Sequence, residues 1–146
     1  MLGDDANMDK KIFVIQRHEA KTTHYDFRLE INDALKSWAI PKEPSIIPNQ
    51  KRLVIETEEH PISYANFEGV IPEGQYGAGK VMIWDRGTYE NRSEIDGKIV
   101  DMDEAYQKGR IKINLFGNKM KGYWALIKTK YLGKDNQWLL IKEKDS

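Results

Sequence analysis

Short stretches in which apolar and polar residues alternate recur along most of the chain, separated by residues that favour turns. Alternation with a period of two residues is typical of β-strands that have one face in a core, and these stretches are rich in the β-branched and aromatic residues that favour strands. The pattern predicts strands at residues 12–17, 24–31, 35–40, 52–58, 80–85, 110–116, 120–129 and 136–142.

Turn and helix signals connect these strands. Asn32-Asp33 and Gly117-Asn118-Lys119 are typical of hairpin turns, and residues 101–108, followed by Gly109, are the best helix candidate. Many short strands with one or two short helices predict an all-β protein built as a closed or partly closed β-barrel of about eight strands, with a β-sandwich as the competing architecture. No repeat or long linker divides the chain, so we expect a flexible arm at residues 1–11 and a single domain at residues 12–146.

The composition narrows the classes to which this 146-residue chain can belong. A formal net charge of zero argues against a protein that coats nucleic acid by bulk charge, but it is compatible with a local basic pocket for one phosphate. The absence of cysteine excludes disulfides, thiolate metal sites and a cysteine nucleophile. No apolar run approaches the roughly 20 residues that span a membrane, and the polar start lacks the apolar region of a signal peptide. We therefore expect a cytoplasmic protein without a membrane partner.

The strand predicted at residues 24–31 has one polar face and one apolar face. Its alternation places His24, Asp26 and Arg28 on one face with Glu30, and aromatic or aliphatic residues on the other. Alternate residues of a strand are about 7 Å apart, so a cation could lie between His24 and Asp26 while Arg28 reaches an anionic ligand beside it. The polar face therefore predicts a metal site next to an anion site.

A third metal ligand is available from the preceding strand. His18 lies six residues before His24, at the end of the preceding apolar run. Two imidazoles and one carboxylate leave coordination positions open for water or a substrate oxygen, as a catalytic metal requires. This donor set suits manganese or zinc, and the spacing does not choose between them. For any one of these histidines alone, a solvated or hydrogen-bonded side chain is the commoner explanation.

A second polar group occupies the strand predicted at residues 52–58 and the residues after it. If this strand stays regular, Arg52, Glu58 and His60 share one face, and Tyr64 follows closely. Arginine in that position could bind phosphate oxygens, although a charged outer face of a strand explains the pattern equally well.

Two further features are better explained by structure than by binding. The glycine-rich segment 69–79 lacks the Gly-Lys-Ser/Thr ending of a phosphate-binding loop, and a strand pattern follows it. We interpret its glycines as tight turns at a corner of the barrel. The four tryptophans lie in apolar strand runs and are expected in the core.

Several motifs, in order from about residue 12 to the end of the chain, resemble one protein family. They are FVIQRH (13–18), HYDFRLE (24–30), LKSWAIPK (35–42), HPISY (60–64), FEGVIPEGQYGAG (67–79), WDRGT (84–88) and QWLLIK (137–142). Together they resemble the 3'-phosphoesterase domain of DNA ligase D, the multifunctional repair ligase of bacteria and archaea. The chain looks like a stand-alone version of that domain.

The resemblance implies a β-barrel whose polar crescent holds the active site of a DNA repair enzyme. Such an enzyme removes a 3'-terminal ribonucleoside from a primer strand and then the remaining 3'-phosphate, with manganese as the usual metal. Matched motif by motif, the metal ligands are His18, His24 and Asp26. The residues expected to act on the phosphate are Arg28, Lys42, Arg52, His60 and Tyr64, with Glu58 in a supporting role. The expected partners are 3' ends of primer–template DNA and a separate ligase and polymerase of end joining.

Two alternatives from other classes remain open. His24 and Asp26 with the later His60 imitate the two-histidine, one-carboxylate site of non-haem iron oxygenases, and iron-dependent oxygen uptake would favour that class. A module that recognises DNA ends without catalysis would bind them tightly without metal or turnover. Within the phosphoesterase interpretation we favour direct attack by water, with His60 either an acid or an electrostatic stabiliser.

Overall fold

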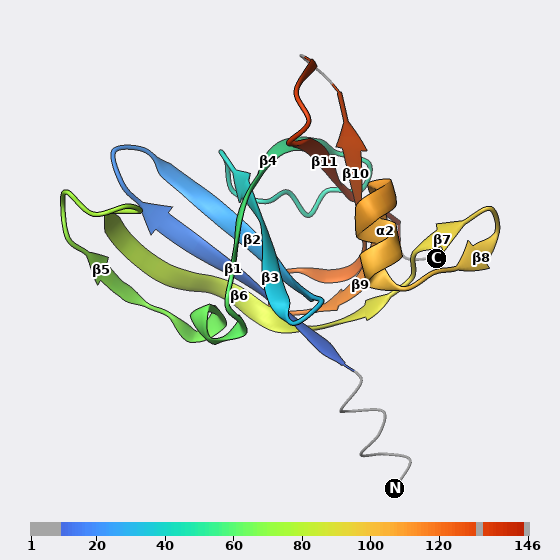
Figure 1. The fold of residues 1–146 in the computed structure, drawn as a ribbon, viewed down its shortest axis with the longest axis horizontal. Coiled ribbons are helices and arrows are strands. Elements are labelled where there is room, and N and C mark those ends of the chain that lie inside the picture. The colour runs from blue at the N-terminus through green and yellow to red at the C-terminus, as the bar shows by residue number, and fades with distance from the viewer. Residues whose placement is uncertain (1–9, 131–132, 145–146) are drawn as a thin grey trace, which may run out of the picture.

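Strands dominate the structure, a computed structural model that describes residues 10–130 and 133–144 (Figure 1). In chain order the elements are β1 (Lys11–Glu19), β2 (Thr23–Ile31), β3 (Ala34–Ile40), β4 (Lys51–His60), the 3-10 helix η1 (Ile62–Asn66), β5 (Gly69–Ile71), β6 (Gly79–Asn91), β7 (Glu94–Ile95), β8 (Lys98–Ile99), α2 (Met102–Lys108), β9 (Arg110–Phe116), β10 (Lys121–Thr129) and β11 (Gln137–Lys142). The all-β prediction is confirmed. No helix in these residue ranges is long and apolar enough to cross a membrane.

Eight of the strands close into an antiparallel barrel. Their order is β1-β2-β3-β4-β11-β10-β9-β6, and β6 returns to pair with β1. Closure pairs the outermost strands with each other and so removes free sheet edges from the barrel wall. The predicted barrel is confirmed, and the alternative of a β-sandwich is wrong.

One side of the barrel continues outward as a wing formed by β1, β2, β5 and β6, at the left of Figure 1. Only the end of β6, from Thr88 to Asn91, pairs with β9 of the barrel. The beginning of β6, from Gly79 to Val81, pairs with the short strand β5 instead. The wing therefore presents a broad strand surface beside the barrel, and η1 and the glycine-rich segment lie along it.

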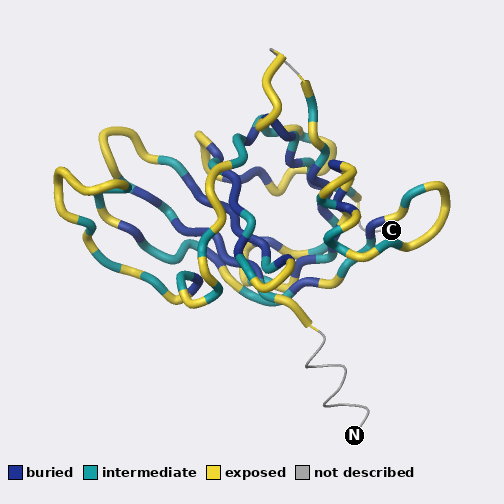
Figure 2. The backbone as a smooth tube through the Cα atoms, viewed as in Figure 1, coloured by how far each residue is buried: buried dark blue, intermediate teal, exposed yellow. Residues whose placement is uncertain are grey.

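The apolar core fills the inside of the barrel, and the exposed residues gather in the loops and at the ends of the wing (Figure 2). Trp38, Trp124 and Trp138 are each no more than 1% exposed, and Trp84 packs against the core from its edge. The core position predicted for the tryptophans is therefore confirmed. Tyr106 of α2 stacks on Trp138, so the helix covers one side of this aromatic cluster.

The predicted turns and helix are also present. Asn32 and Asp33 have φ values of 55° and 63°, as a two-residue hairpin between β2 and β3 requires. The N–H of Gly117 donates to the carbonyl of Met120 in the turn between β9 and β10. Asp101 caps the N-terminus of α2, and Gly109 ends the helix in the left-handed region.

The boundaries differ from prediction in a few places. The strand predicted at residues 80–85 corresponds to β6, which is much longer than predicted. Strands β5, β7 and β8 were not predicted, because they are too short to produce a periodic signal. Of the predicted arm at residues 1–11, residues 1–9 lie outside the described part of the chain, and Lys11 already belongs to β1. Segment 69–79 is not a phosphate loop followed by a helix, because β5, a pair of turns and β6 occupy it.

Candidate active site

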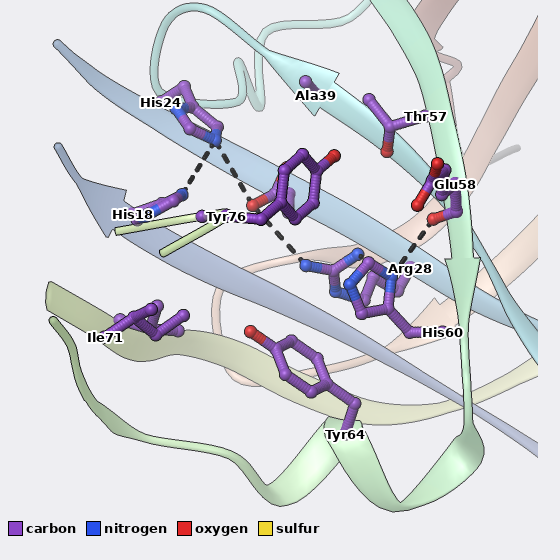
Figure 3. A pocket seen from close by; sticks show the side chains of 13 residues that line it. His18, His24, Arg28, Ala39, Thr57, Glu58, His60, Tyr64, Ile71 and Tyr76 are labelled. Carbon is purple, nitrogen blue, oxygen red and sulfur yellow. Dashed lines mark hydrogen bonds and ion pairs between the residues drawn. The ribbon is translucent and has the colours of Figure 1, made fainter. Parts of the chain in front are cut away.

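The β1–β2 hairpin brings the candidate metal ligands together by its register alone. His18 lies directly opposite His24, and Gln16 lies directly opposite Asp26. The apolar residues of β2 point into the barrel core. By strand alternation His24, Asp26 and Arg28 therefore lie on the opposite face, and Figure 3 shows His24 and Arg28 on that face. The division of β2 into two faces is as predicted.

Three side chains form a group that is able to hold a cation, here called the ligand group: His18, His24 and Asp26. One donor atom from each lies within 4.8 Å of the other two. Nδ1 of His18 is 3.2 Å from Nε2 of His24, and that same Nε2 is 3.3 Å from Oδ2 of Asp26. Two imidazole nitrogens and a carboxylate oxygen in this arrangement match the donor set of a divalent transition metal with open positions.

The surroundings of the ligand group fit a metal as well. Nε2 of His18 lies 3.1 Å from the carbonyl oxygen of Ala78, an acceptor, so this nitrogen carries the proton and Nδ1 presents its lone pair to the ligand group. Burial alone would raise the pKa of Asp26, but the hydrogen bond from His24 and the charge of Arg28 outweigh it and lower the pKa below the usual value. Asp26 is therefore an ionised carboxylate at neutral pH.

Arg28 is a buried cation held in place by neutral partners. Its Nε donates to Gln16 at 2.7 Å and its Nη1 donates to Ser37 at 2.7 Å. Its Nη2 approaches Asp26 at 3.5 Å, an ion pair too long for a good hydrogen bond. Within the described residues Nη2 has no hydrogen-bond acceptor, so its protons are available to an anionic ligand in the pocket.

His60 and Tyr64 reach the same place from β4 and η1. Nδ1 of His60 is 3.1 Å from Nη1 of Arg28. The Tyr64 ring lies against His60, with centroids 4.6 Å apart, and Cζ of Arg28 lies 5.0 Å from the Tyr64 centroid. Gln16 ties these elements together, because its amide donates to the carbonyl oxygens of Tyr64 and Phe67.

The protonation state of His60 follows from its contacts. Burial, and then the charge of Arg28, lower the pKa of His60 below its usual value, against the smaller opposing effects of Glu58 and Asp26. A guanidinium only donates, so its contact with Nδ1 requires the lone pair of that nitrogen. The neutral ring therefore carries its proton on Nε2. The carbonyl of Glu58, also 3.1 Å from Nδ1, becomes a partner only when Nδ1 is protonated.

A bulge in β4 is what turns His60 toward Arg28. Leu35 of β3 pairs with His60 and Ser37 pairs with Thr57, so β4 contains one extra residue between these pairs. Before the bulge, even-numbered residues such as Val54 face the barrel core. After it the alternation is shifted, and His60 faces the pocket.

These side chains line a pocket of about 410 Å³ (Figure 3). Its lining comprises the ligand group with Arg28, Ala39, Thr57, Glu58, His60, Tyr64, Ile71, Tyr76, Gly77 and Val81. A volume of this size is in the usual range for small-molecule and cofactor sites. The pocket is therefore large enough for a phosphate group with part of the nucleotide attached to it.

Two of the predicted residues are not brought to the pocket. Arg52 pairs directly with Leu140, whose side chain is in the barrel core, and directly opposed residues share a face. The expectation that Arg52 and His60 share a face is therefore wrong, because the bulge lies between them. Lys42 is exposed in the bend after β3 and does not line the pocket.

The structure also bears on the oxygenase alternative. That alternative requires His60 as the third ligand beside His24 and Asp26. Among the described residues, the ligand group contains His18 in that place, and His60 contacts Arg28 instead. The predicted iron triad is therefore not assembled.

Sequence reasoning did not single out three residues that matter to the geometry. Gln16 and Ser37 hold Arg28, and Tyr76 lies at the pocket from the glycine-rich segment. The available signal for Gln16 was a polar residue on the same strand face as the candidate ligand His18, whereas the strand of Ser37 contains no candidate ligand. No periodic signal marks Tyr76, because it lies in a turn.

Comparison with known proteins places the chain in a family. Residues 16–128 match the family model described as the DNA Ligase D 3'-phosphoesterase domain. The Multifunctional non-homologous end joining protein LigD of Pseudomonas aeruginosa is 47% identical over 133 residues, which is 91% of this chain and 15% of that protein. The corresponding protein of Mycobacterium tuberculosis is 43% identical over 137 residues, 94% of this chain and 16% of that protein.

A third relative, LigD of Mycolicibacterium smegmatis, is 44% identical over 140 residues, 95% of this chain and 17% of that protein. The chain thus spans 15 to 17% of the length of these curated relatives. The family match covers most of the barrel and all of the ligand group. On this basis, the chain belongs to the DNA ligase D 3'-phosphoesterase domain family.

Proposed function

We propose that this protein hydrolyses phosphoester bonds at the 3' ends of DNA during non-homologous end joining, and that it needs a bound divalent cation to do so. The observation that carries the proposal is the position of Arg28, a buried cation with protons free for an anion, immediately beside the ligand group. Family membership supports the 3'-phosphoester as the target bond. The names of the relatives support a role in end-joining repair.

The cation is held by His18, His24 and Asp26, with manganese the preferred ion and zinc or another divalent cation the alternatives. When bound, such an ion supplies a Lewis acid that polarises a phosphoryl oxygen and lowers the pKa of water. The residues fit this task because Asp26 is ionised and the Nδ1 lone pair of His18 is directed into the group.

The remaining pocket residues bind and stabilise the phosphoryl group. Nη2 of Arg28 donates to a non-bridging oxygen and offsets the charge that develops there. His60 donates from Nε2 as a neutral group, and its geometry favours hydrogen-bond stabilisation of an oxygen over general-base chemistry. Tyr64 packs beside both and keeps its hydroxyl proton, because burial raises its pKa.

The family resemblance also implies roles for Glu58, Lys42 and Arg52. Glu58 lines the pocket, and its side-chain charge acts on His60. Lys42 is exposed outside the pocket, so we propose that it contacts the DNA beyond the phosphate that is being hydrolysed, whereas Arg52, on the other face of β4, is proposed to act only indirectly.

Hydrolysis proceeds in two steps. Water first attacks the phosphorus of the last diester, the terminal ribonucleoside leaves with its 5'-hydroxyl, and a 3'-phosphate remains. A second water then releases inorganic phosphate and leaves a 3'-hydroxyl. A polymerase that adds ribonucleotides would supply the first substrate, and a ligase would consume the final product.

The test uses two labelled primer–template DNAs, one ending in a single 3'-ribonucleotide and the other in a 3'-phosphate. Each is incubated with manganese or with EDTA, using the wild type, Arg28→Ala and Arg110→Ala. Arg110 is an exposed arginine of β9 that does not line the pocket, which makes it a matched control. We expect metal-dependent conversion of both DNAs to a 3'-hydroxyl, a kcat about 10²- to 10³-fold lower in Arg28→Ala, and wild-type rates in Arg110→Ala.

Other results would change the conclusion in defined ways. Conversion of the 3'-phosphate alone would restrict the protein to the second step. Tight binding of both DNAs with no turnover in any metal would favour the module that recognises DNA ends without catalysis.

A further inference from the structure

We propose that the ring of Tyr76 is a base-binding platform, on which the nucleobase attached to the reacting 3'-phosphate stacks. The proposal rests on the proposed function, because it names the subsite that the rest of the terminal nucleotide occupies. It begins from an exposed aromatic ring at the pocket: Tyr76 is 84% exposed and also lines the pocket.

The exposure of Tyr76 has no structural explanation. Tyr76 interacts electrostatically with Arg28, but within residues 10–130 and 133–144 its ring has no aromatic or cation–π contact and its hydroxyl has no hydrogen bond. Other tyrosines in the described part of the chain differ: Tyr25 contacts Trp84, Tyr64 contacts His60, and the hydroxyl of Tyr89 donates to the carbonyl of Glu30. A ring that is mostly in water adds little burial energy to the fold, so stability does not account for a large aromatic residue here.

The turn that carries Tyr76 is fixed to the ligand group. The N–H of Ala78 donates to the carbonyl of Gln75 at 3.1 Å, and Gly77 has a φ of 76°, as the third residue of a type II turn requires. The carbonyl of Ala78 then accepts the Nε2 proton of His18. The turn therefore positions the Tyr76 ring relative to a candidate metal ligand, and it does not leave the ring on a free loop.

The next residue adds a second anchor. Gly79 begins β6, and a Cβ at this position would overlap the backbone oxygen of Glu19 at the end of β1. The glycine thus allows the turn to approach the β1–β2 hairpin closely. Figure 3 shows the resulting arrangement, with the Tyr76 side chain over the space between His24 and Arg28.

The chemistry of a DNA end matches this arrangement. A terminal nucleotide whose phosphate is held by Arg28 and the ligand group must place its sugar and base toward the pocket opening, where Tyr76 lies. Stacking uses the π-face that every base possesses, so it holds the end without selecting a sequence. This property suits an enzyme that repairs ends of any sequence, and the exposed position leaves the ring free for a base.

The kinetic test compares two DNA ends that differ only in the terminal base. Both carry a 3'-phosphate, but one ends in a normal nucleotide and the other in an abasic tetrahydrofuran residue. The proteins are the wild type, Tyr76→Ala, Tyr76→Phe and Val70→Ala. Val70 is the matched control, because it is 72% exposed on neighbouring β5 and does not line the pocket.

For Tyr76→Ala we expect a KM roughly 5- to 150-fold higher on the normal end, which corresponds to the loss of one base–aromatic stack. We expect no rise in KM on the abasic end and little change in kcat on either. Tyr76→Phe keeps the ring and should behave as the wild type, as should Val70→Ala. An equal loss on both ends, or no loss on either, would overturn the proposal.

A binding measurement separates this proposal from the proposed function. DNA whose 3'-terminal base is 2-aminopurine, followed by a 3'-phosphate, is titrated in EDTA with the wild type and with Tyr76→Ala. Quenching that the wild type produces and the variant does not would support stacking, even if no protein turned over the DNA. Equal quenching by both proteins would refute stacking, even if the wild type were fully active.

Discussion

At the scale of single residues, the central feature is that Arg28 is buried yet oriented by its neighbours. It is 4% exposed, and burial lowers its pKa while Asp26 partly opposes that effect. Gln16, Ser37 and His60 take three of its five N–H donors, which leaves the two protons of Nη2 for a ligand in the pocket. In the proposed reaction, a donor that is already oriented needs little reorganisation when charge develops on a phosphoryl oxygen, and preorganised sites lower reaction barriers in this way.

A prediction at this scale concerns His60 and pH. The pKa of His60 is below its usual 6.5 in the folded protein, first through burial and then through Arg28. Between the folded pKa and 6.5 the unfolded chain binds more protons than the folded one, so stability falls as the pH drops through that window. Replacing His60 with Gln removes the imidazole, and with it the part of the acid-induced loss of stability that the imidazole causes.

The measurement is urea unfolding of the metal-free wild type and of His60→Gln at about pH 5 and about pH 7.5. Asp26, Arg28, Glu58 and Tyr64 face His60 and are present in both proteins, so the comparison isolates the change at position 60. We expect a smaller loss of stability at the acidic pH in the variant. Identical losses in the two proteins would contradict the prediction.

At the scale of elements, two strand features build the site, and they differ in how predictable they are. The β1–β2 hairpin places His18 opposite His24 through a short local connection, so strand alternation was sufficient to anticipate the ligand group. The bulge in β4 was not anticipated, because an extra residue depends on how β4 meets β3. The extra residue in the bulge places His60 at the pocket, while Arg52, before the bulge, lies on the opposite face of β4.

A prediction for this hairpin concerns metal binding. A cation that binds only the folded protein stabilises it, by about 2.7 kcal/mol at a concentration 100 times its Kd. We expect manganese to raise the thermal midpoint of the wild type and of His60→Gln, since His60 lies outside the ligand group. His24→Ala should lose this shift, and EDTA should remove it from all proteins. A full shift in His24→Ala would refute the assignment of the ligands.

At the scale of the whole molecule, a buried carboxylate links two parts of the closed barrel. Asp85 of β6 is 3% exposed, and it accepts the backbone N–H groups of Asn118 at 2.9 Å, Lys119 at 3.0 Å and Met120 at 2.7 Å. These belong to the turn between β9 and β10, so Asp85 fastens that hairpin to the strand that continues into the wing. The same turn passes so close to Asp85 that Gly117 has no room for a side chain.

The prediction at this scale is that Asp85→Asn destabilises the protein. The asparagine amide group donates where Asp85 accepts, and each backbone donor left unpaired in a buried site costs about 1–3 kcal/mol. Glu90→Gln is the control, because Glu90 is an exposed acid of the same strand, and an exposed substitution changes stability by roughly 0.5 kcal/mol or less. Urea unfolding measures both variants. Equal stability of the two would show that Asp85 does not hold the closure.

The sequence alone determined the eight strands of the barrel, the two faces of β2, the apolar core and the ligand group, because a period of two residues and a tight hairpin are local properties of a chain. The tertiary structure decided the rest. It closed the barrel through the pairing of β6 with β1, turned His60 inward by a bulge and brought Tyr76 over the site through the contact of Ala78 with His18. Each of these joins segments that are distant in the sequence, and side-chain alternation along one strand carries no information about which distant strand it will meet.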